Sequence, residues 1–110
     1  MIKPVIGRTT IVEIGGKQIT AKIDTGAWSG AIDRDLAKEL NLTKDIINRK
    51  KIFVGDKEFF RPVVRTMVKI GNKKILGRFS LSKRAERKFP LLIGRNILNK
   101  GFLIDTRRCV

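Results

Sequence analysis

Asp24, Thr25 and Gly26 are the residues of this sequence whose types and spacing point most directly to chemistry. Carboxylates hydrolyse an amide bond when two of them share one proton, one as a base on water and the other as an acid toward the carbonyl. Thr25 adds a hydroxyl, and Gly26 allows close backbone approach. Because the same triplet also makes an ordinary turn, taken alone it favours catalysis and a plain turn about equally.

The absence of histidine excludes most other hydrolytic mechanisms. Ser-His-Asp and Cys-His triads need an imidazole that takes and returns a proton, and zinc peptidases of the His-Glu-x-x-His type need it as a ligand. Cys109 is the single cysteine, so it has no partner for a disulfide or a Cys-based metal site. Carboxylate chemistry remains, and we expect no metal and no cofactor.

A dyad of carboxylates cannot come from one copy of this chain, which holds a single Asp-Thr-Gly triplet. We therefore expect a homodimer in which a two-fold axis passes between the two Asp24 side chains. Thr25 would then lie where its hydroxyl can form a hydrogen bond across that axis.

Length and composition indicate one globular domain spanning residues 1–110. Hydrophobic residues make up 42% and charged residues 32%, without a linker or a low-complexity tract. Residues 1–10 lack the apolar core of a signal peptide, and no apolar run approaches the roughly 20 residues that cross a bilayer. The sequence thus predicts a cytoplasmic protein with no membrane partner.

A formal net charge of +15 indicates a negatively charged partner. Nucleic acid is the default partner for such a charge, and an acidic peptide is the alternative. The charge alone does not choose between them.

Periodicity and turn residues predict a mostly β fold. Alternating residues 10–14 and 18–23 flank Gly15-Gly16 and predict a hairpin that delivers Asp24 to a strand end. Asp33 is a suitable N-cap for a short helix over residues 33–40. Further along, we expect strands at residues 52–54, 59–60, 63–70, 75–81, 89–94 and 102–104, solvated charges at 73–74, a solvated charged loop at 83–88, and a helical turn at 95–98.

Two segments in the right order resemble the retropepsin-like aspartic proteases. Asp24-Thr25-Gly26-Ala27 resembles their active-site turn, and Leu92-Ile93-Gly94-Arg95-Asn96 resembles the later strand and short helix of the retroviral enzymes. The resemblance implies a single-lobe, closed acid-protease barrel with one or two short helices, and peptide hydrolysis by a homodimer. Because both segments are present, a catalytic role for Asp24 is favoured over an ordinary structural turn.

A narrower resemblance covers segments 61–66, 79–84, 89–95 and 101–105. They look like the bacterial and archaeal retropepsin-like proteins associated with the ligase RimK, which are often described as ATP-dependent zinc proteases. With no histidine and no phosphate-cradling Gly-rich loop, this sequence predicts neither zinc nor ATP. Because that ligase adds glutamates to a protein tail, the resemblance and the charge together imply a glutamate-rich substrate.

The resemblance to retropepsins also implies which residues meet the substrate, namely Ala27, Trp28, Ser29 and Ile93. The retroviral enzymes carry an acidic pair where this chain has Trp28-Ser29, so the substrate contacts and the partner of Arg95 must differ. Trp28 is either a subsite wall or a packing residue. Residues 48–60, with a tip at Gly55-Asp56, are the expected flap over the substrate, and an ordinary surface hairpin is the alternative.

Two functions from different classes follow. The favoured one is a homodimeric aspartic endopeptidase, in which Asp24, Thr25 and Gly26 form the catalytic turn. The alternative is a non-catalytic basic module that binds nucleic acid or the ribosome on the same scaffold. The chain has no tyrosine and few other aromatic residues for base stacking, which disfavours the second function.

Overall fold

The computed structural model describes residues 2–84 and 88–110. Strands dominate this part of the chain, and two short α-helices accompany them, as the sequence predicts. The elements are β1 (Val5–Ile6), β2 (Thr9–Ile14), β3 (Lys17–Ile23), β4 (Gly30–Asp33), α1 (Arg34–Glu39), the 3₁₀ turn η1 (Leu42–Lys44), β5 (Ile46–Val54), β6 (Lys57–Ile70), β7 (Lys73–Ser82), β8 (Leu91–Ile93), α2 (Arg95–Leu98) and β9 (Leu103–Ile104).

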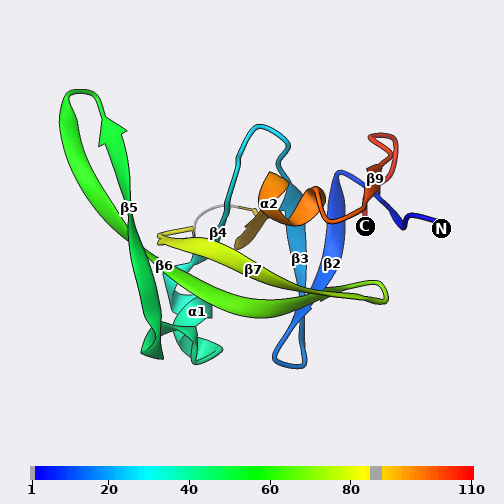
Figure 1. Ribbon diagram of the computed structural model, residues 1–110, viewed down its shortest axis with the longest axis horizontal. Helices are drawn as coiled ribbons and strands as arrows, with labels where there is room; N and C mark the ends of the chain where they lie inside the picture. The colour runs from blue at the N-terminus through cyan, green and yellow to red at the C-terminus, as the bar shows by residue number, and fades with distance from the viewer. Residues whose placement is uncertain (1, 85–87) are drawn as a thin grey trace.

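One sheet carries most of the chain, in the order β2-β3-β8-β4-β7-β6-β5. Strand β8 comes late in the sequence, yet it lies between β3, to which it is parallel, and β4, to which it is antiparallel. A further pairing of Glu13 with Lys69 joins β2 to β6 and brings the sheet round on itself. Figure 1 shows the β5–β6 hairpin projecting from this body on the side away from the chain termini.

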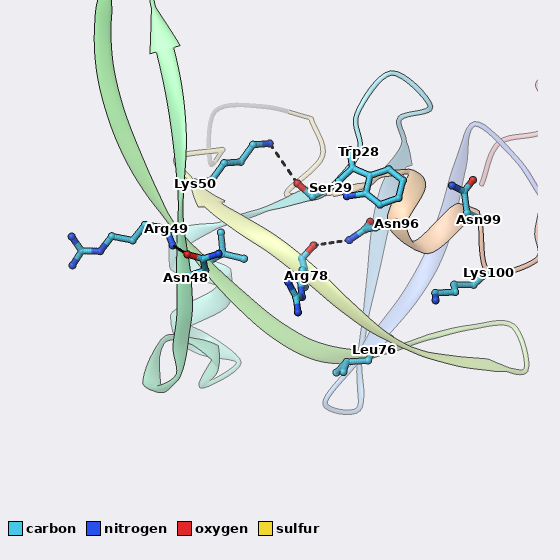
Figure 2. A pocket seen from close by; sticks show the side chains of 11 residues that line it. Trp28, Ser29, Asn48, Arg49, Lys50, Leu76, Arg78, Asn96, Asn99 and Lys100 are labelled. Carbon is cyan, nitrogen blue, oxygen red and sulfur yellow. Dashed lines mark hydrogen bonds between the residues drawn. The ribbon is translucent and has the colours of Figure 1, made fainter.

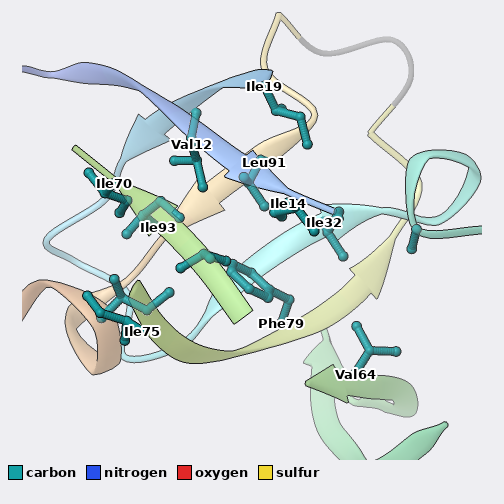
Figure 3. Close-up of a cluster of buried hydrophobic side chains, with 14 of the residues drawn as sticks. Val12, Ile14, Ile19, Ile32, Val64, Ile70, Ile75, Phe79, Leu91 and Ile93 are labelled. Atoms are coloured by element: carbon teal, nitrogen blue, oxygen red, sulfur yellow. The ribbon is translucent and has the colours of Figure 1, made fainter. Parts of the chain in front are cut away.

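The core lies inside the curved sheet and follows the alternation of its strands (Figure 3). In β2, Val12 and Ile14 are buried whereas Ile11 is exposed, because successive side chains of a strand point to opposite faces. Phe79 is the largest fully buried side chain. Each such side chain contributes about 1.5–3 kcal/mol by leaving water, so this cluster is the main stabilising element of the fold. Its other fully buried members include Ile32, Val64, Val68, Ile70, Leu91, Ile93 and Ile97.

The local predictions for the first forty residues are confirmed. Gly15 and Gly16 have φ values of 57° and 84°, as a primed hairpin turn between β2 and β3 requires. The helix expected over residues 33–40 is α1, and the Asp33 carboxylate caps it by accepting the Leu36 N–H at 3.3 Å. The second oxygen of Asp33 accepts the Arg84 N–H at 2.7 Å, so this buried carboxylate also ties α1 to the segment after β7.

Strand β6 is longer than the sequence predicts, because the expected strands at 59–60 and 63–70 merge into one. Pro62 stands between them and has no N–H to donate. It pairs with Arg49 of β5, whereas pairing with β7 begins only at Val63 opposite Ser80. The proline therefore lies where one side of the strand needs no partner, which is where a strand tolerates it.

The two predictions of solvated charge hold for Lys74, Lys83 and Lys88, which are exposed, but not for Arg84 and Lys73. In the loop expected at 83–88, Arg84 is buried, and its Nε donates to the Phe89 carbonyl at 3.2 Å. Residues 85–87 of that loop lie outside the described residues. Lys73 is half-buried: its ammonium contacts the Lys100 carbonyl and lies 5.3 Å from the centre of the Phe102 ring. Both cations satisfy backbone carbonyls, which their sequence context did not reveal.

Strands β1 and β9 form a separate two-stranded parallel sheet near the termini. Leu103 N–H donates to the Pro4 carbonyl at 3.0 Å, and Val110 N–H donates to the Thr9 hydroxyl at 2.9 Å. The two ends of the chain are thus held against the β2 side of the body (Figure 1). Across residues 2–84 and 88–110, none of the helices has the length and apolar character that crossing a membrane requires.

Candidate active site

Asp24 follows β3 directly, and its main chain is held by β8. The two strands run parallel with Ile23 opposite Ile93. The Asp24 N–H donates to the Ile93 carbonyl at 2.9 Å, which continues the ladder by one residue beyond the end of β3. Because both strands belong to the core, the backbone of Asp24 is fixed to the rigid part of the molecule.

The triplet forms a tight turn around the Asp24 carboxylate. Oδ1 of Asp24 accepts the Gly26 N–H at 3.0 Å, and the Asp24 carbonyl accepts the Ala27 N–H at 3.3 Å. The side chain is half-buried, whereas Thr25 and Gly26 are exposed. The carboxylate is thus oriented by the backbone of its own turn while the neighbouring two residues face outward.

The first N–H groups of helix α2 donate hydrogen bonds to the residues that follow the turn. The first N–H groups of a helix have no partner within the helix. Here Arg95 N–H donates to the Ala27 carbonyl at 2.9 Å and Asn96 N–H donates to the Trp28 carbonyl at 2.8 Å. A Cβ on Gly94 would lie 2.8 Å from the Trp28 carbonyl oxygen, so glycine is needed for this close approach.

The Arg95 side chain adds a third connection between α2 and the turn. Its Nη1 donates to the Thr25 carbonyl at 2.8 Å. Its guanidinium carbon lies 5.9 Å from the centre of the Trp28 ring, within the range of a cation–π contact. The partner of Arg95 that the sequence left open is therefore a backbone carbonyl together with the indole of Trp28.

An open groove of about 590 Å³ begins at Trp28 and Ser29, next to the turn. Figure 2 shows its side chains, which come from the loop after the Asp24 turn, the first half of β5, strands β6 and β7, helix α2 and the turn that follows α2. Lys50 of β5 reaches across and donates to the Ser29 hydroxyl at 3.4 Å. Among the described residues, four cations and no carboxylate line the groove, so it favours a negatively charged ligand. The lining residues are Trp28, Ser29, Asn48, Arg49, Lys50, Val63, Leu76, Arg78, Asn96, Asn99 and Lys100.

The structure brings the predicted site residues together, but it buries the side chain of one of them. Trp28 is 60% exposed and Ser29 is half-buried, and both line the groove, next to the Asp24 turn that Ala27 closes. Ile93 has no exposed surface, because its side chain belongs to the core. In the described chain Ile93 therefore offers the substrate no side-chain surface, and its carbonyl positions Asp24 instead.

Sequence reasoning missed the groove residues of β7 and of the turn after α2, namely Leu76, Arg78, Asn99 and Lys100. Asn96 was noticed only within the resemblance. Its side-chain amide donates to the Arg78 carbonyl at 3.4 Å and joins α2 to β7 (Figure 2). An outward-facing apolar residue between cations, as Leu76 is, was the one signal in the sequence that could have drawn attention to this wall.

The hairpin predicted at residues 48–60 is present as β5 and the first part of β6. Its turn is at Gly55-Asp56, and Gly55 has a φ of 64°. Apolar side chains on it are exposed, with Phe53 at 67% and Phe60 at 59%. The described residues contain no cluster of three or more Cys, Asp or Glu side chains suited to a metal ion.

The chain is similar in structure to several solved proteins. It shares 20% identity and a TM-score of 0.66 with the protein Lpg0085 of unknown function (DUF785) from Legionella pneumophila, over 96% of this chain and 94% of that one. The retroviral protease-like domain of Ddi1 from Leishmania major gives 19% identity and a TM-score of 0.61, over 84% of this chain and 74% of that one. The Simian Foamy Virus (mac) protease gives 16% identity and a TM-score of 0.66, over 83% of this chain and 91% of that one.

At these identities the structural likeness shows the fold, which is of the retroviral protease type. No curated protein sequence matches the chain. The family model described as aspartyl protease matches residues 10–96, which include the Asp24 turn, β8 and the start of α2. Since this match covers most of the 110 residues, the chain belongs to the aspartyl protease family.

Proposed function

We propose that the protein is a homodimeric aspartic endopeptidase whose dyad consists of Asp24 from each of two copies. The observation that carries this proposal is the fixed turn: the Asp24 backbone is bonded to the core strand β8 while its carboxylate accepts the Gly26 N–H. In a dimer, a turn held in this way can lie against the same turn of the second copy across a two-fold axis. A second carboxylate is then available without any further residue of the chain.

The reaction needs one proton shared by the two aspartates. The ionised Asp24 removes a proton from water, whose oxygen attacks the peptide carbonyl carbon, while the protonated Asp24 of the other copy donates its proton to the carbonyl oxygen. The tetrahedral intermediate then breaks its C–N bond. The leaving nitrogen takes a proton from one aspartate, and a hydroxyl of the intermediate returns a proton to the other aspartate as the new carbonyl forms. The products are a carboxylic acid and an amine, and the dyad again holds one proton.

Supporting groups surround this dyad in the proposal. The Gly26 N–H orients the Asp24 carboxylate. The Thr25 hydroxyl would form a hydrogen bond across the two-fold axis. The β5–β6 hairpin, with its exposed Phe53 and Phe60, would close over the substrate and exclude water.

The charge of the groove beside the turn supports the proposal that the substrate is an acidic protein. Arg49, Lys50, Arg78 and Lys100 line it, and no carboxylate does so in the part of the chain that the structure describes. The resemblance to RimK-associated proteins suggests a glutamate-rich tail, and this assignment stays a prediction. A glutamate-rich peptide that the active enzyme neither binds nor cuts would contradict it.

The decisive experiment is digestion of a mixed peptide library that includes glutamate-rich members, between about pH 4 and 7. Asp24→Asn should abolish cleavage while leaving the fold intact, because it removes the base and keeps the size of the side chain. Asp45→Asn, at an exposed position directly after η1 and outside the groove and the hairpin, is the matched control and should retain cleavage. Mixing the native protein with an excess of Asp24→Asn should also lower its activity, since mixed dimers lack one carboxylate.

A basic module that binds nucleic acid without catalysis is the second candidate. The net charge of +15 favours it. It predicts no cleavage by a folded protein, together with oligonucleotide binding that weakens steeply as salt is raised. Cleavage that depends on Asp24 would remove this candidate.

A further inference from the structure

The outer face of the β6–β7 ribbon carries an arrangement of charge that the proposed dyad does not use. Side chains of β6 and β7 that are directly opposite each other fall into three exposed pairs. These are Arg65 opposite Arg78, Met67 opposite Leu76, and Lys69 opposite Lys74, and we call these six residues the ribbon face.

Two of these three pairs are unfavourable for the protein alone. Like charges directly opposite each other on neighbouring strands are destabilising. Among the described residues, none of these four cations forms an ion pair. Glu13 of β2 is opposite Lys69 on the side of β6 away from β7, but the two side chains do not form an ion pair. The Arg65–Arg78 pair has no opposing carboxylate in either strand of the ribbon. Repulsion that the fold itself leaves uncompensated indicates that an anion compensates it.

The third pair lies between the two charged pairs and is apolar. Met67 is 51% exposed and Leu76 is 54% exposed. Along a strand, side chains on one face repeat every ~7 Å, so the charged pairs are about 13 Å apart with the apolar pair midway. The face therefore offers positive charge, then apolar surface, then positive charge.

We propose that the ribbon face binds an extended peptide segment with the pattern acidic-x-apolar-x-acidic. An extended peptide has the same ~7 Å repeat on each face, so its first and fifth side chains reach the two cation pairs and its third reaches Met67 and Leu76. A nucleic acid fits less well, because the face has no aromatic side chain on which a base could stack and a phosphate chain gains nothing from the apolar pair.

The ribbon face is continuous with the groove at the candidate active site. Leu76 and Arg78 belong to both, and Figure 2 shows them along β7 below Trp28. The inference thus rests on the proposed function in one respect: it assigns the ribbon face to a substrate segment that lies beyond the residues near the dyad. Its chemistry can nevertheless be tested by binding alone.

The test uses the full chain carrying Asp24→Asn, so that no peptide is cut. Fluorescence anisotropy would compare a labelled peptide Gly-Ser-Glu-Ser-Leu-Ser-Glu-Ser-Gly with a control in which the same residues are reordered to Gly-Ser-Glu-Glu-Leu-Ser-Ser-Ser-Gly. The first peptide should bind about fivefold to tenfold more tightly, because only its spacing places both carboxylates on the cation pairs. Equal affinities would overturn the proposal.

Paired substitutions locate the binding. Arg65→Gln with Arg78→Gln should weaken the first peptide about tenfold and remove its advantage over the control. Lys38→Gln with Lys44→Gln removes the same charge from α1 and η1, and should change the affinity less than twofold. Equal losses in the two double variants, or tighter binding of an oligouridine that depends on Arg65 and Arg78, would show that the proposal is wrong.

Cleavage is measured separately with the native Asp24. If native protein cuts peptides but the ribbon variants bind the first peptide normally, the ribbon proposal fails and the protease proposal stands. If nothing is cut but the spacing-dependent binding is found, the protease proposal fails and the ribbon face stands.

Discussion

Arg95 donates a hydrogen bond from Nη1 to the carbonyl oxygen of Thr25 at 2.8 Å, across 70 positions of sequence. The same guanidinium lies beside the Trp28 ring. The side chain of the first residue of α2 thus contacts Thr25, which precedes Gly26, and Trp28, which lies two residues after it. It holds the outward part of the turn, whereas Ile93 holds its base through the Asp24 N–H.

Replacing Arg95 should lower catalysis more than stability. Arg95→Met keeps much of the side-chain length but loses the bond to Thr25, so we expect kcat to fall about tenfold to a hundredfold through misplacement of the turn. The free energy of unfolding should fall by about 1 kcal/mol or less, since one hydrogen bond is lost. Arg95→Lys keeps the charge and one donor, and should recover part of kcat. Peptidase kinetics and urea unfolding check both effects, and equal activity of Arg95→Met and native protein would contradict this role.

Gly94→Ala should destabilise the fold strongly. The new Cβ would lie 2.8 Å from the Trp28 carbonyl oxygen and from the Ser29 carbonyl carbon, and both belong to backbone that is held by α2. We expect a loss of about 2–3 kcal/mol in the free energy of unfolding, as for overpacking in a core. Gly55→Asn is the control, because its site has open space and asparagine tolerates positive φ. Urea unfolding of both variants provides the measurement, and a loss below that of the control would contradict the packing described here.

Arg65→Gln should make the protein more stable, which is unusual for a substitution. It removes one of two like charges that are opposite each other on β6 and β7. The expected gain is about 0.2–1 kcal/mol, measured as a higher melting temperature at low salt and a smaller gain at high salt. Lys51→Gln, which breaks the ion pair with Glu58, should instead leave the melting temperature unchanged or slightly lower. A lower melting temperature for Arg65→Gln would show that Arg65 is stabilising in the free protein.

Asp105 gives a pH dependence whose sign can be stated in advance. Side-chain hydrogen bonds from Arg107, at 3.0 Å, and then the Arg107 backbone N–H hold the pKa of Asp105 below its ordinary value of 3.8. Because the folded pKa is depressed, the stabilisation is present above pH 3.8 and is lost as the pH falls through the folded value.

Arg107→Gln should therefore raise the pKa of Asp105, which an NMR titration of its carboxyl carbon would detect. Arg108→Gln is the control, because Arg108 acts on Asp105 only through its charge and is the smallest of the causes. Arg108→Gln should therefore raise the pKa of Asp105 less than Arg107→Gln does. An unchanged titration in Arg107→Gln would mean that the pair does not persist in solution.

Salt should strengthen the proposed dimer. Each copy carries a net charge of +15, and the Debye length falls to ~10 Å at 0.1 M salt, so added salt screens the repulsion between copies. We expect the dimer dissociation constant to fall about tenfold between roughly 0.02 and 0.3 M sodium chloride, as measured by sedimentation velocity. Cleavage activity at low protein concentration should rise in parallel. A dimer that is tight at low salt and weaker at high salt would argue against this account.

Local features of the chain were determined by the sequence itself. The alternation around Gly15-Gly16 and the capping residue Asp33 each act over a few neighbouring residues, and both elements formed where they were expected. The Asp24 turn lies at a strand end for the same reason. Its place directly after β3 follows from the hairpin, whereas its orientation also depends on the bond to Ile93.

Tertiary structure alone decided what surrounds that turn. Strand β8 lies between β3 and β4, which are far from it in the sequence, because the three strands share one core, and this placement buried the Ile93 side chain. The packing of α2 brought Arg95 to Thr25. Periodicity tells which face of a strand is buried, but the neighbour of each exposed side chain depends on pairing between distant segments, which no local pattern encodes.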